Sequence, residues 1–545
     1  MPTENFSTKL TNYLDAGYTF LAIESHEELR VLAAIRAVAR TRTCINEDDK
    51  TIPLRYGEWD CIGGLEMMTF SKKGEVTNAE TINASNEPIK ALMQIGLKDA
   101  DPGIYVMKDM HPYIGKDTVC RKIRNIEGIL KEKGSTVIFL SPRISIPSEL
   151  SKDVQQLSFE LPTRADLAVL FESFVDNSVR EKPQYRNLKL DDGYPAAVAE
   201  AAMGMSEMEA DNAFGLATIA INKANGSLTF NGEFTRRVFE EKIATLRNTA
   251  LEYMPLVTGF EQIGGMDNLK LWAMQRRLGF EAAARARNLP FPKGILLAGI
   301  KGTGKTVTAM AIAKEFRFPL FKLDVGKLFA SKVGETEALT RELIRILDGL
   351  GRAVILLDEI EKSFNTGATS GGGDSGVSSR LFGALISWMS LKTCPVFIVG
   401  TLNDHQNIPP ELLRKGRFDE VWWVDLPDPT ERMAIFDALL KNRYKPDKWS
   451  GTVTKEVLDA TRDFTGAEIE AAIQEALYFS LSDESEFDLL LLKACQEITP
   501  QAQLDPTGLD AMRQRAKAFK PASSVSGDKL PALPSAKRGS RKLTV

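Results

Sequence analysis

A glycine-rich octapeptide between an apolar run and a helix-forming run constrains the fold of this chain more than any other feature. The octapeptide is GIKGTGKT (299–306), which follows the apolar run 294–298 and precedes VTAMAIAKEF. It has the form G-x-x-x-x-G-K-[ST] of a phosphate-binding P-loop. Its glycines let backbone N–H groups surround an anion, and the helix that follows adds its positive dipole end. The sequence therefore predicts an α/β fold with a nucleotide site at this loop.

The last residues of the loop have separate predicted roles. We expect Lys305 to contact the β- and γ-phosphates of ATP and the Thr306 hydroxyl to bind Mg²⁺. The other ATP contacts predicted for this segment are Gly299, Lys301, Gly302, Thr303, Gly304 and Val307.

A second apolar run, AVILL (353–357), ends in the acidic pair Asp358 and Glu359. In doubly wound α/β sheets ligands bind at the carboxyl ends of the strands, so we expect this pair to lie beside the P-loop. Asp358 is predicted to contact ATP-bound Mg²⁺ through water, and Glu359 to polarise the attacking water as the catalytic base.

Three further polar residues follow the next apolar run. Asn403 ends the segment VFIVGTLN and is predicted to orient the attacking water or to contact the γ-phosphate. Arg414 and Arg417, in PPELLRKGRFDE, are predicted arginine fingers that neutralise charge in the transition state. In a head-to-tail ring such fingers serve the neighbouring subunit, which would make catalysis depend on assembly.

Five motifs, in the order in which they occur along the chain, resemble those of the AAA family of AAA+ ATPases. FEQIGGM (260–266) resembles the entry motif of that family, which implies that Ile263 and Gly264 contact the adenine. FTGAEIEAAIQEA resembles its lid motif, which implies that Gly466 and Ala467 lie against the nucleotide. The resemblance covers about 260–500 and implies a P-loop AAA+ core, a doubly wound parallel sheet with a helical lid.

A more detailed resemblance spans most of the chain. The segments LFASKVGETE, DEIEKSF, GDSGVSSRLFGALISWM and AGYTFLAIESHEELRV are similar to AAA proteins encoded in red-algal plastids and cyanobacteria. One position departs from the wider family. Lys332 occupies the slot where many substrate-threading members have an aromatic pore residue, which argues against threading, unless Lys332 simply faces solvent.

The N-terminal half repeats elements of the C-terminal half. The parallel segments are 104–110 with 354–360, 137–150 with 396–412, 157–171 with 421–436, and 205–214 with 466–477. The first apolar run, TFLAIES, leads to HEELR, which has no glycine and no Lys-Thr pair, and no arginine pair follows Leu150. We therefore predict a degenerate AAA-like α/β domain that binds no nucleotide. The alternative is that any two α/β sheets share this degree of similarity.

The domain boundaries follow from these patterns and from changes in composition. A Gly-rich insert at 366–376 is predicted to be a mobile loop, and the Ser-, Pro- and Lys-rich tail from about Pro521 to be disordered. The predicted domains are a degenerate α/β domain (1–163), a helical subdomain and linker (164–250), the ATPase core (251–427), the lid (428–500) and a C-terminal helix with basic tail (501–545).

The composition narrows the functional class. The net charge is −4, so no overall positive field attracts nucleic acid, which we consider an improbable partner. Five scattered cysteines, no signal peptide and no apolar run of membrane-spanning length predict a cytoplasmic protein without a membrane span.

These observations predict an ATPase that couples Mg-ATP hydrolysis, in a homo-oligomeric ring of six subunits, to remodelling of a protein client. Two alternatives stay open. The basic tail, with seven Lys or Arg and one Asp from Lys517 onward, is compatible with a nucleic-acid-associated motor. An ATP-gated assembly or adaptor protein, with slow hydrolysis as a timer, is the other.

Overall fold

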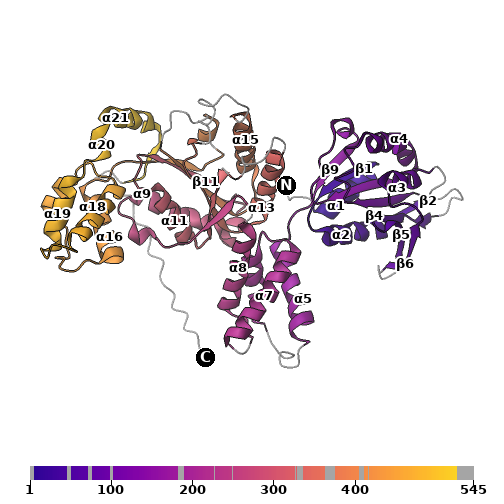
Figure 1. Ribbon diagram of the computed structural model, residues 1–545, viewed down its shortest axis with the longest axis horizontal. Helices are drawn as coiled ribbons and strands as arrows, with labels where there is room; N and C mark the ends of the chain where they lie inside the picture. The colour runs from indigo at the N-terminus through magenta and orange to yellow at the C-terminus, as the bar shows by residue number, and fades with distance from the viewer. Residues whose placement is uncertain are drawn as a thin grey trace. The chain divides into compact units, whose positions relative to one another are not determined.

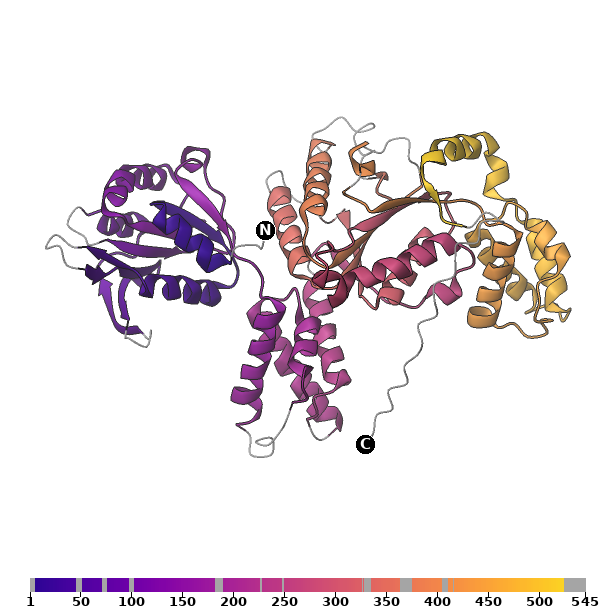
Figure 2. The same cartoon turned by 180° about the vertical axis from the view of Figure 1, so that it is seen from behind.

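The computed structural model forms two compact units, drawn in Figures 1 and 2: Met1–Pro162 with Ser206–Asn212, and Thr163–Met205 with Ala213–Val545. Within the described ranges no helix is long and apolar enough to cross a membrane. The structure describes residues 5–45, 51–70, 76–97, 102–181, 190–225, 228–247, 249–325, 327, 335–362, 375–403, 410–414 and 416–523.

The first unit is built on a seven-stranded sheet with the order β6-β5-β4-β7-β8-β1-β9. The β4-β5 and β5-β6 pairs are antiparallel, and the remaining pairs are parallel. A separate antiparallel ribbon pairs β2 with β3. The strands are β1 (Phe20–Glu24), β2 (Thr43–Ile45), β3 (Thr51–Pro53), β4 (Arg55–Asp60), β5 (Gly64–Phe70), β6 (Val76–Ile82), β7 (Gly103–Lys108), β8 (Thr136–Ser141) and β9 (Val154–Ser158).

Two apolar layers cover this sheet because successive strand residues point to opposite faces. Phe20 and Ala22 of β1 belong to a core with apolar residues of α3 and α4. Leu21 and Ile23 belong to a second core with residues of α1 and α2. The helices are α1 (Phe6–Asp15), α2 (Glu28–Arg40), α3 (Pro88–Ile95) and α4 (Asp117–Lys133), and the short 3₁₀ turn η1 is Ser148–Leu150.

The sheet of the second unit has the order β10-β12-β13-β14-β11-β15-β16, and only β10 runs antiparallel to its neighbour. Its strands are β10 (Leu251–Met254), β11 (Gly294–Gly299), β12 (Leu320–Leu323), β13 (Ala353–Leu357), β14 (Val396–Leu402), β15 (Glu420–Val424) and β16 (Lys520–Pro521). Its helices next to the sheet are α9 (Asp267–Arg277), α10 (Ala282–Ala286), α11 (Lys305–Phe316), α13 (Glu335–Gly349) and α15 (Ser375–Leu391), with 3₁₀ turns η4 (Phe260–Gln262), η5 (Leu278–Phe280) and η6 (Pro410–Leu413).

Helical elements flank both ends of this second sheet. Before it come α5 (Arg164–Phe174), the π-helical turn η2 (Val175–Val179), α6 (Tyr194–Ala202), α7 (Glu207–Asn225) and α8 (Gly232–Leu246). After it come α16 (Pro429–Leu439), the π-helical turn η7 (Leu440–Tyr444), α17 (Lys455–Ala460), α18 (Gly466–Phe479) and α19 (Phe487–Glu497), which share one apolar core and form the lid. The helices α20 (Gln501–Leu504) and α21 (Pro506–Arg515) and the 3₁₀ turn η8 (Ala516–Ala518) follow.

The predicted fold class is confirmed, since both units contain a mainly parallel, doubly wound sheet. The apolar runs at 294–298 and 353–357 are β11 and β13, to within one residue at each end, and the apolar run that ends before Asn403 is β14. The two sheets share an order as well. If the parallel strands of each unit are numbered along the chain, β9-β1-β8-β7-β4 and β15-β11-β14-β13-β12 both read 5-1-4-3-2.

The prediction that the chain is disordered from about Pro521 was wrong for its first residues. Pro521 pairs with Trp423 of β15, and Ala522 is buried. The Ala522 carbonyl accepts a hydrogen bond from the Leu269 amide. Edge pairing and burial therefore override the polar composition here. Residues 524–545, the Gly-rich insert from 366 to 374 and Lys332 lie outside the described residues.

Candidate functional site

The predicted P-loop lies between the carboxyl end of β11 and the first residue of α11. Gly302 and Gly304 have φ values of +83° and +84°, a conformation that L side chains rarely adopt. A Cβ at Gly302 would also meet the Thr465 hydroxyl of the lid at 3.0 Å. These two glycines are thus required by the backbone, which bends to direct the loop toward the start of α11.

Lys305, the first residue of α11, is buried in the loop. Its Nζ donates hydrogen bonds to the carbonyl oxygens of Gly299, at 2.9 Å, and Ile300, at 2.7 Å. Burial lowers the pKa of Lys305 to about 8, against the opposing influence of carboxylates that include Glu361 and Asp358. The ammonium is held by two neutral carbonyls, an arrangement that an anionic ligand could replace at a gain in electrostatic energy.

Asp358 follows the last residue of β13 and lies among three donors. Its Oδ1 accepts hydrogen bonds from the hydroxyls of Thr401, at 2.7 Å, and Thr306, at 3.2 Å. Its Oδ2 accepts one from Lys322 Nζ at 3.0 Å. Burial opposes ionisation of Asp358, but these hydrogen bonds and the charge of Lys322 outweigh it and lower the pKa. The carboxylate is therefore ionised and oriented toward the P-loop threonine.

Glu359 has a backbone φ of +51°, unusual for a residue with a side chain. Its amide donates to the Thr401 hydroxyl at 2.8 Å, and its Oε1 accepts from Asn403 Nδ2 at 2.9 Å. The backbone N–H of Asn403 in turn donates to Glu361 Oε1 at 3.0 Å. Thr401 thus connects Asp358, the predicted metal-binding residue, to Glu359, the predicted base, and Asn403 holds the Glu359 carboxylate by a hydrogen bond.

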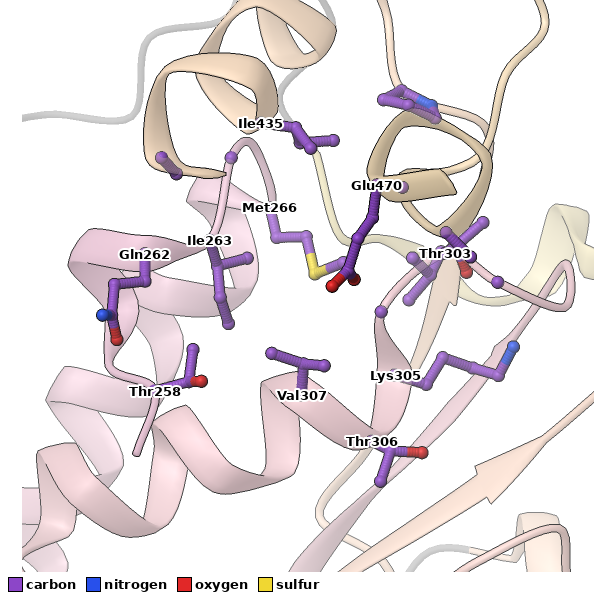
Figure 3. Close-up of a pocket in the computed structure, with 18 of the residues that line it drawn as sticks. Thr258, Gln262, Ile263, Met266, Thr303, Lys305, Thr306, Val307, Ile435 and Glu470 are labelled. Atoms are coloured by element: carbon purple, nitrogen blue, oxygen red, sulfur yellow. The ribbon is translucent and has the colours of Figure 1, made fainter. Parts of the chain in front are cut away.

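These residues open into a cavity of about 910 Å³. Figure 3 shows Thr303, Lys305 and Thr306 at the P-loop side of this cavity, and Ile263 across from the lid residue Ile435. The Ala467 amide at the start of α18 donates to the Gly302 carbonyl at 3.0 Å, which joins the lid to the P-loop. The predicted residues that line the cavity are Ile263, Gly264, Lys301, Gly302, Thr303, Gly304, Lys305, Thr306, Val307, Asp358, Glu359, Asn403, Gly466 and Ala467.

Three predicted residues do not line the cavity. Gly299 lies beneath the loop, where its carbonyl holds Lys305. Arg414 is exposed and Arg417 half-buried, on the segment that follows η6. The Nη1 atom of Arg417 is buried without a hydrogen-bond partner within the described part of the chain. The two arginines therefore do not reach the cavity of their own chain.

Several site residues were missed by sequence reasoning. Thr401 and Lys322 each interrupt an apolar strand with one polar side chain, and that interruption is the signal that could have identified them. On the lid side, Glu470 extends into the cavity (Figure 3), where it accepts a hydrogen bond from the Tyr444 hydroxyl and forms an ion pair with Arg443 at 2.5 Å. No local motif marks these lid residues.

A P-loop, an adjacent acidic pair and a helical lid on a 5-1-4-3-2 parallel sheet define a P-loop nucleotide-binding protein. Residues 295–426 match the family model "ATPase family associated with various cellular activities (AAA)", and residues 6–159 match "SpoVK-like AAA ATPase, N-terminal domain". The chain belongs to the AAA ATPase family.

Relatives that match most of the chain, and one that matches part of it, support this assignment. An "Uncharacterized AAA domain-containing protein ycf46" of Guillardia theta is 34% identical over 513 residues, 93% of this chain and 94% of that protein. The protein of the same name from Pyropia yezoensis is 32% identical over 93% of this chain and 97% of its own length. A "Cell division cycle protein 48 homolog" of Archaeoglobus fulgidus is 31% identical over 258 residues, 45% of this chain and 34% of that protein. The resemblance to algal AAA proteins noted in the sequence is confirmed.

Proposed function

We propose that the second unit binds Mg-ATP and hydrolyses it to ADP and phosphate. The observation that carries this proposal is the network of Asp358, Thr401, Glu359 and Asn403, which places two carboxylates beside a P-loop in fixed orientations. Lys305 would exchange its two carbonyl partners for phosphate oxygens. Glu359 would take the proton of the attacking water, while Asn403 keeps its carboxylate in place.

The oxygens next to the P-loop fit Mg²⁺. Thr306 and Asp358 present a hydroxyl and an ionised carboxylate 3.2 Å apart, and oxygen donors are the ligands that Mg²⁺ prefers. Thr306 would hold the ion directly and Asp358 through water. When bound, the ion neutralises negative charge on the phosphate oxygens.

The position of the arginines supports assembly into a ring. Arg414 and Arg417 lie outside the cavity of their own chain, and a buried guanidinium nitrogen of Arg417 has no partner among the described residues. Because an arginine beyond Lys305 and the metal stabilises transition-state charge at the γ-phosphate in this class of reaction, we infer that a neighbouring subunit supplies it. A homo-oligomer of six subunits in the cytoplasm is the assembly we propose.

The work done by hydrolysis is proposed to be the remodelling of a protein client. Two α/β units and two helical regions offer a large surface for a protein, and the net charge of −4 gives no general attraction for nucleic acid.

The test is ATP hydrolysis by the full chain, compared with the variant Glu359→Gln. The variant should bind ATP with wild-type affinity and retain it unhydrolysed. Equal turnover in both proteins would remove Glu359 from the role of base. Affinity capture with the variant in its ATP state then identifies the client, and stimulation of the wild type by DNA or RNA instead of protein would favour a nucleic-acid motor.

A further inference from the structure

A lysine on an inner strand holds one oxygen of the predicted magnesium-binding carboxylate. Lys322 is the third residue of β12 and lies in register with Leu356 of β13. Its strand neighbours Phe321 and Leu323 are buried, whereas the Lys322 side chain is 39% exposed. Its Nζ lies 3.0 Å from Asp358 Oδ2, so the lysine ends at the carboxyl edge of the sheet, beside the P-loop.

The two oxygens of Asp358 face different partners. Oδ1 accepts from the hydroxyl of Thr306, the predicted metal ligand, and from that of Thr401. Oδ2 accepts from the ammonium of Lys322. A fixed positive charge and the predicted metal position are thus separated by a single carboxylate group, which is only 18% exposed. At this short separation, in a partly buried site, solvent and salt screen the repulsion between two cations only weakly.

Lys322 has two opposing effects on metal binding. It helps to orient Asp358, which favours the metal, and it repels a second cation, which disfavours it. The orientation does not depend on Lys322 alone, because Thr401 holds the same carboxylate at 2.7 Å and also bonds the Glu359 amide. Lys305 is a second cation of this site, coupled to Asp358, but it is present in the wild type and in every Lys322 variant alike, so its repulsion cancels in the comparison. The repulsion is therefore the effect that a substitution of Lys322 reveals.

We propose that Lys322 is a positioning residue that raises the Mg²⁺ requirement of the site by competing with the metal for Asp358. This inference rests on the proposed Mg-ATP site of the second unit. At low Mg²⁺ the lysine neutralises Asp358 and the carboxylate is withheld from the metal. As the Mg²⁺ concentration rises, Asp358 is shared between the two cations. Nucleotide binding then responds to free Mg²⁺ over a higher concentration range than it would without the lysine.

The test is a Mg²⁺ titration of the full chain with a fluorescent ADP analogue as the probe, followed by the fluorescence change on metal-dependent binding. Lys322→Gln should lower the half-saturating Mg²⁺ concentration by roughly tenfold, the scale expected for removing one charge a few ångströms from a divalent ion. Lys322→Arg keeps the charge and should retain the wild-type midpoint. Lys322→Met serves as a second neutral variant if the glutamine protein does not fold.

Lys314→Gln is the matched control. Lys314 lies near the C-terminal end of α11, its side chain is 42% exposed against 39% for Lys322, and it forms an ion pair with Glu261. This substitution should leave the Mg²⁺ midpoint unchanged. An unchanged or higher midpoint in folded Lys322→Gln or Lys322→Met would overturn this inference while the proposed site stands. Absence of probe binding to the wild-type chain at every Mg²⁺ concentration would instead overturn the proposed site, and this inference with it.

Discussion

The two α/β units share a strand order but differ at the loop after their first parallel strand. In the second unit, five residues, 300–304, connect β11 to α11 and contain the two left-handed glycines. In the first unit only three residues, 25–27, connect β1 to α2. At this place the buried Glu27 carboxylate accepts from the Glu207 amide at 2.8 Å and from Arg30 at 2.9 Å. The apolar framework is thus retained without the backbone that surrounds a phosphate.

The strand that carries the acidic pair shows the same contrast. Asp109, the first residue after β7, and Glu359, the second residue after β13, both have a φ of +51°, which marks them as equivalent positions. The preceding residue is Lys108 in the first unit and Asp358 in the second. Lys108 pairs with the acid Asp60 at 3.1 Å, whereas Asp358 pairs with a lysine. The strained backbone is common to both units, but the first has an ammonium where the second has the carboxylate that is predicted to bind the metal.

Strand register extends the contrast to the neighbouring strand. In the first unit Lys108 lies in register with Leu140 of the neighbouring strand. In the second unit Leu357 lies in register with Gly400, so the residues that follow them, Asp358 and Thr401, correspond to Lys108 and Leu140. Leu140 therefore occupies the position of Thr401. A leucine side chain forms no hydrogen bonds, so the first unit lacks the connecting hydroxyl as well as the predicted metal ligand.

The helical regions repeat too. An 11-residue helix followed by a five-residue π-helical turn occurs as α5 with η2 and as α16 with η7. Both helices begin with a capping box, formed by Thr163 and by Asp428. The match of unusual π-helical turns at equivalent places supports duplication over the alternative that two α/β sheets look alike by chance.

The comparison is tested most severely by Lys305→Ala, because it removes the only P-loop lysine of the chain. If the first unit binds no nucleotide, this one substitution should abolish ATP binding by the entire protein. Titration of the full chain with labelled ATP and Mg²⁺ measures it, with Lys314→Ala as the control for loss of a lysine from the same helix. Binding of one ATP per chain at micromolar concentration in Lys305→Ala would show that the first unit is an active site.

A second large effect should come from the arginines that only the second unit has. Arg414→Ala and Arg417→Ala should each leave ATP affinity nearly intact and lower turnover by roughly two or more orders of magnitude. Mixing either variant with Lys305→Ala protein should restore part of the activity, since an intact phosphate site can then adjoin an intact finger. A specific activity independent of protein concentration, in a species that sediments as a monomer, would contradict the ring.

Thr401→Val should produce an intermediate effect. It removes the hydroxyl that joins Asp358 to the Glu359 amide and leaves that amide unpaired, at a cost of about 1–3 kcal/mol. If the cost falls on the transition state, turnover drops roughly ten- to hundredfold. Thr461→Val is the control, because it deletes another buried hydroxyl, directly after α17 of the lid, that does not line the cavity. Turnover equal to wild type would show that Thr401 does not position the acids.

The contiguous parts of the site were predictable from the sequence, and the parts made by register were not. The P-loop and the acidic pair are short segments whose chemistry depends on adjacent residues. Thr401 and Lys322 gain their roles only from which residue of the next strand lies opposite, and that register is not visible in one strand. The antiparallel strands β5 and β6 were also missed, because polar residues such as Glu66 and Asn78 interrupt their apolar pattern.

The smallest expected effect separates two reasons why the first unit is predicted to bind no nucleotide. Glu27 places negative charge where phosphate charge would lie, and the three-residue loop offers no glycine backbone to surround an anion. Glu27→Gln removes the charge and keeps an oxygen that can accept the Glu207 amide, so the thermal stability of the unit should fall only modestly.

In a Lys305→Ala background, which silences the second unit, Glu27→Gln should still bind no labelled ATP. The loop geometry persists in the variant, and backbone N–H groups are what a phosphate site requires. The wild-type first unit in the same background is the matched control. Binding that appears with Glu27→Gln would mean that a single carboxylate, rather than the missing cradle, keeps the first unit empty, and the two units would then differ by charge more than by backbone.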